Sequence, residues 1–256
     1  MPEVSVIVTT YNRKEYLKEA IDSILYQTYK DFELIVVDNY SNYDFISFIT
    51  GFNDNRIRFF QNHNNGIIAA NRNVGIKNAI GKFLSFCDDD DIWLPTKLEV
   101  QVRNLNVYNS NFSFSNIFIF NDYGFEKKTN YKNINNINQF LLKSQITLSS
   151  VTIRNNKEIL FNEDNNIVGL EDYELWLRLI QDDPNIDFIC TPLVKNRIND
   201  SSNSRQSKSN YELTTIKFRL SLLLSRNRYS TYSKIIIFYR IILNCIRYYA
   251  FVILRK

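Results

Sequence analysis

Residues 88–91 are four consecutive aspartates, and they suggest chemistry more clearly than any other stretch of this 256-residue chain. They follow an apolar run, 82–87, and precede Pro95, which predicts a helix start. Because adjacent negative charges repel one another, folding should gather them around something positive. Hard oxygen ligands suit Mg²⁺ or Mn²⁺, which often bridge to substrate phosphates. A solvated acidic turn that stabilises the start of the next helix is the alternative, and the run alone leaves both open.

The elements that would position the aspartates alternate between short strands and helices. Strands are expected at 4–9, 32–37, 57–60 and 83–87, because these runs are short, apolar and partly β-branched. Between them, the apolar spacing predicts a helix around 17–25, where Asn12 with Glu15 resembles a capping box, and a second helix is expected around 70–77. This alternation favours an α/β fold with a mostly parallel sheet and helices on both faces. In such sheets ligands bind at the carboxyl ends of the strands.

The middle of the chain is less regular. We expect strands at 112–120 and 149–153, and a loop with little definite structure at 121–138. Glu171 and Asp172 precede a predicted helix in which Trp176 belongs to the core-facing stripe. Capping alone would explain two carboxylates at a helix start.

Charge is distributed unevenly. Residues 201–256 hold eleven Lys and Arg and one acidic residue, whereas the rest of the chain is net acidic. Such asymmetry indicates two kinds of partner. The three cysteines are widely spaced and there is a single histidine, which argues against a disulfide scaffold, a zinc site or a multi-histidine metal cluster. A reducing cytoplasm fits this cysteine usage, and we expect no signal peptide because the chain enters a strand directly.

Five blocks of sequence together resemble glycosyltransferase family 2 over roughly residues 3–195. In order they are VIVTTYNR (6–13), ELIVVDNYS (33–41), NRNVGI (71–76), the four aspartates, and EDYELWLR (171–178). The resemblance implies a GT-A fold, a nucleotide-sugar donor, a divalent metal (Mn²⁺ or Mg²⁺) and inversion at the anomeric carbon. The metal would neutralise charge on the departing nucleoside diphosphate.

The same resemblance implies roles for particular residues. Asp90 would be the direct metal ligand, although the run of four permits more than one register. Asp172 would be the catalytic base, with Glu171 orienting it or facing solvent. The residues expected to bind the nucleotide sugar are Thr9, Tyr11, Asp38, Asn39, Arg72, Asp88 and Asp89. Among them, Tyr11 would lie against the base and Arg72 near the diphosphate, a surface position being the alternative for Arg72.

Asn39 departs from the family pattern, because many uridine-diphosphate users carry a second aspartate there. An asparagine can still accept a hydrogen bond from the base and can also donate one. The expected donor is therefore a UDP-hexose, with a thymidine-diphosphate sugar such as dTDP-rhamnose as the alternative.

The basic tail contains two apolar stretches, 216–224 and 234–254, after a polar segment, 201–210, expected to be a linker or a lid. Arg240 and Arg247 would each cost roughly 2.5–3.5 kcal/mol at a membrane centre, which disfavours a spanning helix. With Asn244 they form one polar stripe, beside several tyrosines. This pattern favours a helix lying in the interface of an anionic membrane, and a helical pair packed on the body or in a homodimer remains the alternative.

These observations predict three regions: a nucleotide-sugar-binding half (1–110), an acceptor-binding half with the catalytic base (111–200) and a basic amphipathic helical tail (201–256). The expected acceptor is a polyprenyl-diphosphate-linked sugar used in O-antigen or capsule synthesis. The expected location is the cytoplasm, peripheral at the inner face of the plasma membrane. A non-catalytic nucleotide-sugar-binding protein is an alternative. A nucleic-acid partner is not expected, because the tail's bulky apolar stretches suit a membrane better than RNA.

Overall fold

The computed structural model describes residues 1–143, 145–156, 158–198, 208–225 and 228–253. The chain forms two compact units. Unit 1 comprises residues 1–133, 146–161 and 185–198, and unit 2 comprises 134–145, 162–184 and 199–256. Both units therefore draw on segments that are far apart in the sequence.

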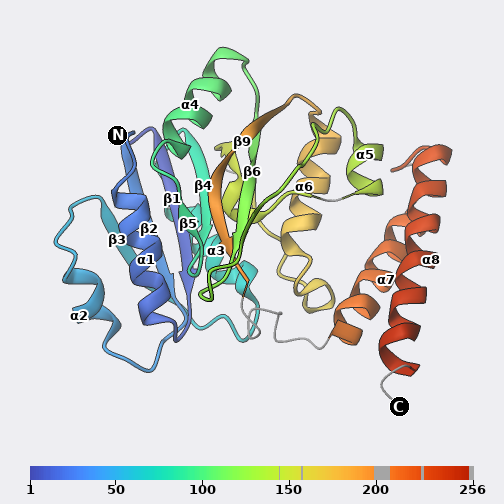
Figure 1. The fold of residues 1–256 in the computed structure, drawn as a ribbon, viewed down its shortest axis with the longest axis horizontal. Coiled ribbons are helices and arrows are strands. Elements are labelled where there is room, and N and C mark those ends of the chain that lie inside the picture. Colours follow the sequence, from blue (N-terminus) through green and yellow to red (C-terminus); the bar gives the residue numbers. More distant parts are fainter. Residues whose placement is uncertain (144, 157, 199–207, 226–227, 254–256) are drawn as a thin grey trace. The chain divides into compact units, whose positions relative to one another are not determined.

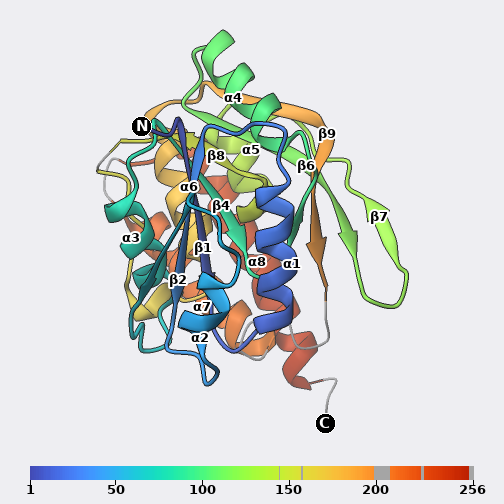
Figure 2. The same ribbon diagram turned by 90° about the vertical axis from the view of Figure 1, so that its left-hand side faces the viewer.

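Unit 1 is built on one mixed sheet (Figures 1 and 2). Its strands are β1 (Val4–Thr10), β2 (Phe32–Asp38), β3 (Ile57–Gln61), β4 (Phe83–Asp88), β5 (Ile92–Trp93), β6 (Phe112–Phe120), β7 (Glu126–Lys128), β8 (Thr152–Arg154) and β9 (Ile186–Arg197). Their order is β3-β2-β1-β4-β8-β6-β9-β5, with β7 beside β6. The helices are α1 (Lys14–Leu25), α2 (Phe45–Thr50), α3 (Ile68–Asn78) and α4 (Lys97–Val107), with a short 3-10 turn, η1 (Leu148–Ser150).

The predicted α/β fold is confirmed. Strands β3, β2, β1 and β4 pair in parallel, as their alternation with helices predicts. The other half of the sheet is mixed: β8 runs antiparallel to β4 and β6, whereas β9 runs parallel to β6. The strand predicted at 149–153 is shorter, because its first residues form η1. The predicted loop at 121–138 contains β7 and the start of another helix.

Helices cover both faces of strand β1. Leu17, Ile21 and other apolar residues of α1 join the same buried cluster as Val6. On the opposite face α3 approaches so closely that a Cβ added to Gly75 would lie 2.5 Å from the Ile7 side chain. Only a glycine at this position lets α3 pack against the strand without displacing Ile7.

The prediction that Asn12 caps α1 is wrong. The residue before the helix is Arg13, with no side-chain cap, and Asn12 has a positive φ of 55°. Its side-chain oxygen instead accepts a hydrogen bond from the Asn42 backbone N–H at 2.7 Å, and its own N–H donates to Ser41. Asn12 thus connects the loops after β1 and β2, a long-range bond that a local capping pattern cannot reveal.

Unit 2 is helical. Its elements are α5 (Ile137–Leu142), the 3-10 turn η2 (Asn165–Ile167), α6 (Glu171–Asp182), α7 (Lys208–Leu224) and α8 (Thr231–Ile253). Tyr173 of α6 stacks on Phe140 of α5 and meets Phe218 of α7 edge-on. Trp176 is fully buried, which confirms that it packs in the core.

The tail forms a helical pair, α7 and α8. The predicted polar stripe of α8 does not face outward as a whole, since Asn244 is buried and donates to Glu212 of α7. The apolar residues of α8 divide between its two sides: Ile236, Ile237 and Ile241 are buried, whereas Ile235, Phe238 and Ile242 are exposed. Of the predicted linker or lid, residues 201–207 lie outside the described part of the chain. None of the described helices is both long enough and apolar enough to cross a membrane.

Candidate functional site

The carboxyl ends of three parallel strands bring the predicted nucleotide-binding residues to one edge of the sheet in unit 1. Thr10 pairs in register with Asp38 at the end of β2, and Thr9 pairs with Asp88 at the end of β4. Tyr11 follows directly after β1 and is 38% exposed, whereas Asp38 is fully buried. Residues from three separate sequence blocks thus lie at neighbouring strand ends.

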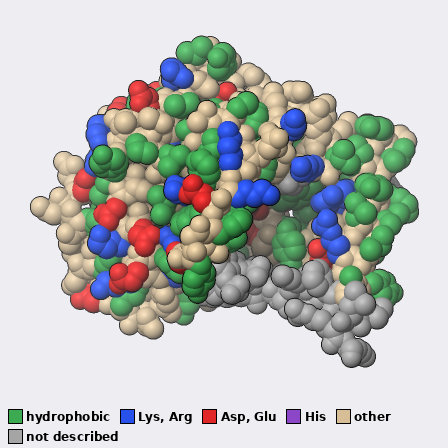
Figure 3. Space-filling model, in the orientation of Figure 1, with side chains coloured by type: hydrophobic (Ala, Val, Ile, Leu, Met, Phe, Trp, Pro, Cys, Tyr) green, Lys and Arg blue, Asp and Glu red, His purple; other side chains and the backbone are tan. Residues whose placement is uncertain are grey.

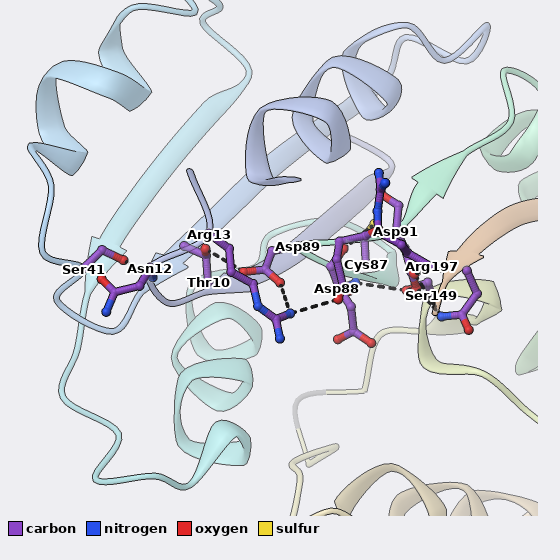
Figure 4. A network of polar contacts seen from close by, with 12 residues as sticks. Thr10, Asn12, Arg13, Ser41, Cys87, Asp88, Asp89, Asp91, Ser149 and Arg197 are labelled. Atoms are coloured by element: carbon purple, nitrogen blue, oxygen red, sulfur yellow. Dashed lines mark hydrogen bonds and ion pairs between the residues drawn. The ribbon is translucent and has the colours of Figure 1, made fainter. Parts of the chain in front are cut away.

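Arg13 supplies the positive charge that the aspartates require (Figure 4). Its guanidinium lies 3.0 Å from an oxygen of Asp89 and 3.0 Å from an oxygen of Asp90. The Thr10 hydroxyl also donates to Asp89, at 2.8 Å. Burial raises the pKa of Asp89 to about 6, although the nearby Arg13 opposes this shift. Arg13 is therefore the counter-ion of the middle of the aspartate run.

A second arginine pairs with the first aspartate. Arg72 of α3 donates to Asp88 at 3.1 Å, and its side chain is 7% exposed. Its guanidinium also lies over the Phe161 ring, 5.3 Å from the centroid. Arg72 is therefore held at the site and is not a surface residue, the alternative considered for it.

Asp91 differs from the other three aspartates in its hydrogen-bond partners. It is fully buried, and it accepts hydrogen bonds from Ser149, from Asn196 and from the backbone N–H of Arg197. Burial, with the charges of Asp88 and Asp90, raises the pKa of Asp91 to about 8. Since its oxygens are occupied by protein donors, Asp91 joins β4, η1 and β9 and is not oriented as a ligand.

The remaining aspartates fit a divalent cation. The Asp88 side chain is 33% exposed and that of Asp90 11%, and each has an oxygen paired with an arginine rather than with a buried neutral donor. Hard carboxylate oxygens suit Mg²⁺ or Mn²⁺. No group of three or more His, Cys, Asp or Glu suited to a metal occurs among the described residues. This donor set resembles sites where one or two carboxylates and substrate phosphates share the ion.

The base-binding side of the predicted pocket is ordered by hydrogen bonds. Asp38 accepts from the backbone and hydroxyl of Ser41 and from Gln61. Asn39 accepts from the Asn64 backbone N–H at 2.9 Å. The next residue along the chain, Tyr40, stacks on His63, with ring centroids 3.8 Å apart. The loops after β2 and β3 are thereby joined beside the strand ends.

The predicted base, Asp172, lies in unit 2 at the start of α6. Its carboxylate accepts from the Tyr173 backbone N–H at 2.6 Å, and the side chain is half-buried. Burial, followed by the negative charge of Asp172, raises the pKa of Tyr211 in α7. Glu171 does not face solvent; it is buried and accepts from the Gly169 N–H.

Several residues of the site were not predicted. Arg13 stood inside a recognised block, and the need of four carboxylates for a counter-charge was a signal that could have identified it. Ser149, Asn196 and Arg197 carried no such signal. They reach Asp91 and Asp90 only because β9 and η1 return to the sheet next to β4.

We expect Asp91→Asn to destabilise unit 1 by about 2–4 kcal/mol, because an amide group would face donors and leave buried groups unsatisfied. Urea unfolding followed by circular dichroism measures this free energy. Asp22→Asn is the matched control: Asp22 is exposed and pairs with Lys18 one turn away, so the expected change is below about 0.5 kcal/mol. Equal effects of the two substitutions would contradict the role given to Asp91.

The model of Glycosyl transferase family 2 matches residues 5–167, more than half of the chain. The chain belongs to this family. The match includes β1 to β4, the four aspartates and Arg72, and its range ends before α6. The predicted family and the GT-A fold are thus confirmed, whereas the binding and catalytic roles of single residues stay predictions.

Curated relatives of this family 2 chain include glycosyltransferases from bacteria. An uncharacterised glycosyltransferase of Rickettsia felis is 35% identical over 221 residues, which are 84% of this chain and 36% of the relative. This chain therefore spans about a third of that protein's length. WfgD of Escherichia coli, a UDP-Glc:α-D-GlcNAc-diphosphoundecaprenol β-1,3-glucosyltransferase, is 32% identical over 203 residues, covering 78% of each chain.

Solved structures share the fold of this family 2 chain at low sequence identity. Residues 1–349 of S. aureus TarS, in complex with UDP-GlcNAc, match with a TM-score of 0.75 and 18% identity, covering 99% of this chain and 76% of that 1–349 chain. The mannosyltransferase PcManGT of Pyrobaculum calidifontis, in complex with GDP-Man and Mn²⁺, matches with a TM-score of 0.68 and 15% identity, covering 94% and 70%. Both matches support the fold alone.

Proposed function

We propose that the protein is an inverting, metal-dependent glycosyltransferase that moves a hexose from a nucleotide sugar to a glycan acceptor. One observation carries the proposal: Asp38, Arg72 and the Asp88-x-Asp90 pair converge on one edge of a parallel sheet in a chain of family 2. Ligands of open α/β sheets bind at this edge. Residues 1–110 would bind the donor, and residues 111–200 would hold the acceptor and the base.

Different residues bind different parts of the donor. Thr9, Tyr11, Asp38 and Asn39 bind the nucleoside, with Asp88 and Asp89 toward the ribose. Asp90 is the direct ligand of Mn²⁺ or Mg²⁺, and the ion when bound neutralises charge on the departing diphosphate.

Arg13 and Arg72 already neutralise the same carboxylates. Their guanidinium groups also match phosphate oxygens in geometry, so both could bind the diphosphate if an ion were held by the aspartates. The ion pairs with aspartate thus keep both arginines beside the diphosphate position before the donor arrives.

Asp172 is the catalytic base. A carboxylate can take the proton from the acceptor hydroxyl as its oxygen attacks the anomeric carbon. Attack opposite the departing diphosphate inverts that carbon in one step. The backbone N–H of Tyr173 fixes one oxygen of Asp172, and this bond orients the carboxylate.

We favour a UDP-hexose as donor. The donor in the name of WfgD is UDP-Glc, which supports a UDP-sugar for this chain. Asn39 is the position that bears on this choice, since its side-chain oxygen is already held by the Asn64 N–H and its amide group is a donor. A donor amide fits a carbonyl oxygen of the pyrimidine ring, which both uracil and thymine carry, so dTDP-rhamnose is the second candidate.

The acceptor is a sugar on a polyprenyl diphosphate, used in O-antigen or capsule synthesis at the cytoplasmic face of the plasma membrane. The name of WfgD specifies such an acceptor, and WbnJ of Escherichia coli is named an O-antigen biosynthesis glycosyltransferase, which supports the proposal. A second support is the outward side of α8, the α8 apolar face, which Figure 3 shows in green on the right. Its exposed residues are Ile235, Phe238, Tyr239, Ile242, Ile246 and Tyr249.

This face suits a membrane surface because basic residues accompany it. Lys217, Arg228 and Arg247 are exposed on the same helical pair or at its turn, and the described part of the pair has one acidic residue, Glu212, which is buried. Exposed aliphatic and aromatic side chains with cationic neighbours bind anionic lipid surfaces.

We expect the double variant Phe238→Glu, Ile242→Glu to bind vesicles of phosphatidylcholine and phosphatidylglycerol about 100-fold more weakly, since two apolar side chains no longer enter the lipid. Flotation measures the bound fraction. Val107→Glu, which changes an exposed apolar residue of α4, is the control and should float like the wild type. Undiminished flotation of the double variant would remove the membrane contact from the proposal.

A donor screen tests the transfer reaction itself. Release of nucleoside diphosphate is measured with UDP-, GDP- and dTDP-sugars, with and without Mn²⁺, in the presence of a lipid-linked acceptor. We expect turnover with one UDP-hexose and none after chelation. Turnover with dTDP-rhamnose alone would select the second candidate, and metal-independent turnover would contradict the role of Asp90.

A further inference from the structure

The described part of unit 2 contains a buried arginine with two nitrogens that have no hydrogen-bond acceptor. Arg219 of α7 is 4% exposed, and its Nε and Nη1 atoms have no hydrogen-bond partner. Its guanidinium lies over the Tyr173 ring, 5.7 Å from the centroid. The ring face is attractive to a cation, but it accepts none of the hydrogen bonds that the planar group offers.

A second arginine lies near the first. Arg240 of α8 is half-buried, and its Nε also lacks a hydrogen-bond partner. Burial, followed by the positive charges of Arg219 and Arg247, lowers the pKa of Arg240. The hydroxyl of Tyr173 in α6 is a further buried polar atom without a hydrogen-bond partner. Two arginines and one hydroxyl of unit 2 thus have donor groups without a hydrogen-bond acceptor.

Two other charged groups of unit 2 that are not exposed have partners, so acceptors are not absent from this unit. Arg178 of α6 makes a two-nitrogen ion pair with Glu174, and Glu212 accepts from Asn244. Neither Arg219 nor Arg240 has an ion pair within the described part of the chain. A buried charge without a counter-charge is costly to the fold, and such groups are usually paired.

An anion would remove this cost. Water could satisfy the N–H donors but would leave two neighbouring positive charges uncompensated. The fork of an arginine matches the oxygens of phosphate, and a pair of arginines matches a group with two negative charges. The α8 apolar face belongs to the same helix as Arg240, with Phe238, Tyr239 and Ile242 close to it in sequence. An anion attached to a hydrocarbon chain could bind the two arginines with its charged group and the α8 apolar face with its chain.

We infer that Arg219 and Arg240, with the Tyr173 hydroxyl, form a binding site for the phosphate group of a lipid, separate from the donor site of unit 1. Two lipids carry this chemistry: a polyprenyl diphosphate and an anionic phospholipid. The inference does not depend on glycosyl transfer, because the site is defined by groups of unit 2 that the transfer reaction does not use.

The first test uses inorganic pyrophosphate as the probe and the full chain in EDTA, where a metal-dependent donor site does not compete. We expect pyrophosphate to raise the Tm of the wild type. Arg219→Met and Arg240→Met should each weaken pyrophosphate binding at least about tenfold, as expected for loss of hydrogen bonds to a charged group. Without pyrophosphate, Arg219→Met should unfold at the same or a higher temperature, because an unpaired buried charge is gone.

Lys217→Met is the matched control. It removes one exposed positive charge from the same helix and should leave pyrophosphate binding within about twofold, as surface charges contribute little. If it weakens binding as much as Arg219→Met, the effect is diffuse charge and the proposed site is wrong. The site is also wrong if Arg219→Met lowers the Tm and leaves binding intact, since Arg219 would then be structural.

The second test distinguishes the two lipids. Phosphatidylcholine vesicles containing either undecaprenyl diphosphate or phosphatidylglycerol are compared for flotation of the wild type and of Arg219→Met. A loss of binding confined to the first vesicles identifies the polyprenyl diphosphate, and a loss confined to the second identifies the phospholipid headgroup. Equal binding of the wild type and the variant to both vesicles would overturn the inference.

Discussion

Replacing Asp90 by asparagine is expected to lower kcat/KM for sugar transfer by about 10²–10⁴-fold, because the metal supplies several kcal/mol of charge stabilisation and each 1.36 kcal/mol is a factor of ten. An amide oxygen is a neutral, weaker ligand for Mn²⁺. Nucleoside diphosphate release at a series of Mn²⁺ concentrations measures the loss and the shift in metal requirement.

The Asp90→Asn variant should fold normally. Burial and the charge of Asp88 raise the pKa of Asp90 against the opposing effect of Arg13, so on balance its negative charge is disfavoured there. Removing the charge relieves this repulsion, so the Tm without metal should not fall. The rise in Tm that Mn²⁺ gives the wild type should be lost, and a site filled to 100 times its Kd contributes about 2.7 kcal/mol.

Asp31→Asn is the control, since Asp31 is an exposed aspartate directly before β2, at the opposite end of that strand from Asp38. It should retain both activity and the stabilisation by Mn²⁺. Asp90→Asn with wild-type activity and an unchanged metal requirement would move the ligand role to Asp88 or Asp89.

The sheet illustrates how far the residues predict the fold. Strands β1 to β4 were recognised because each is a short apolar run and the runs alternate with segments predicted to be helical. β9 was not recognised, since Pro192 interrupts it and its apolar positions do not alternate. Its pairing with β6 contains register shifts around Asn116, which follow from the irregular strand. Such long-range pairing leaves no local pattern.

The aspartate run could be recognised from its composition, but the sequence alone does not show which of its four members are available for a cation. Asp91 turns inward because Asn196 and Arg197, more than 100 residues later, supply donors for it. That contact leaves Asp88 and Asp90 as the pair available for a cation. The stripe on α8 had the same limitation: its period predicts an amphipathic helix, but only Glu212 on α7 decides that Asn244 faces inward.

Asp172→Asn is expected to reduce kcat by about 10²–10⁴-fold, the usual contribution of a general base, with donor affinity unchanged. Asparagine keeps an oxygen that can accept from the Tyr173 N–H, so the start of α6 should keep its conformation. Donor binding by calorimetry and single-turnover transfer to a lipid-linked acceptor separate the two effects.

Asp182→Asn is the control for Asp172→Asn, because Asp182 is an exposed aspartate at the opposite end of the same helix. Its kcat should stay within about twofold of the wild type, as is usual for a surface substitution. Glu171→Gln separates orientation from catalysis: the Glu171 carboxylate accepts from the Gly169 N–H, so its loss should lower stability more than kcat. If Asp172→Asn binds donor normally and transfers at the wild-type rate, another group removes the proton from the acceptor hydroxyl.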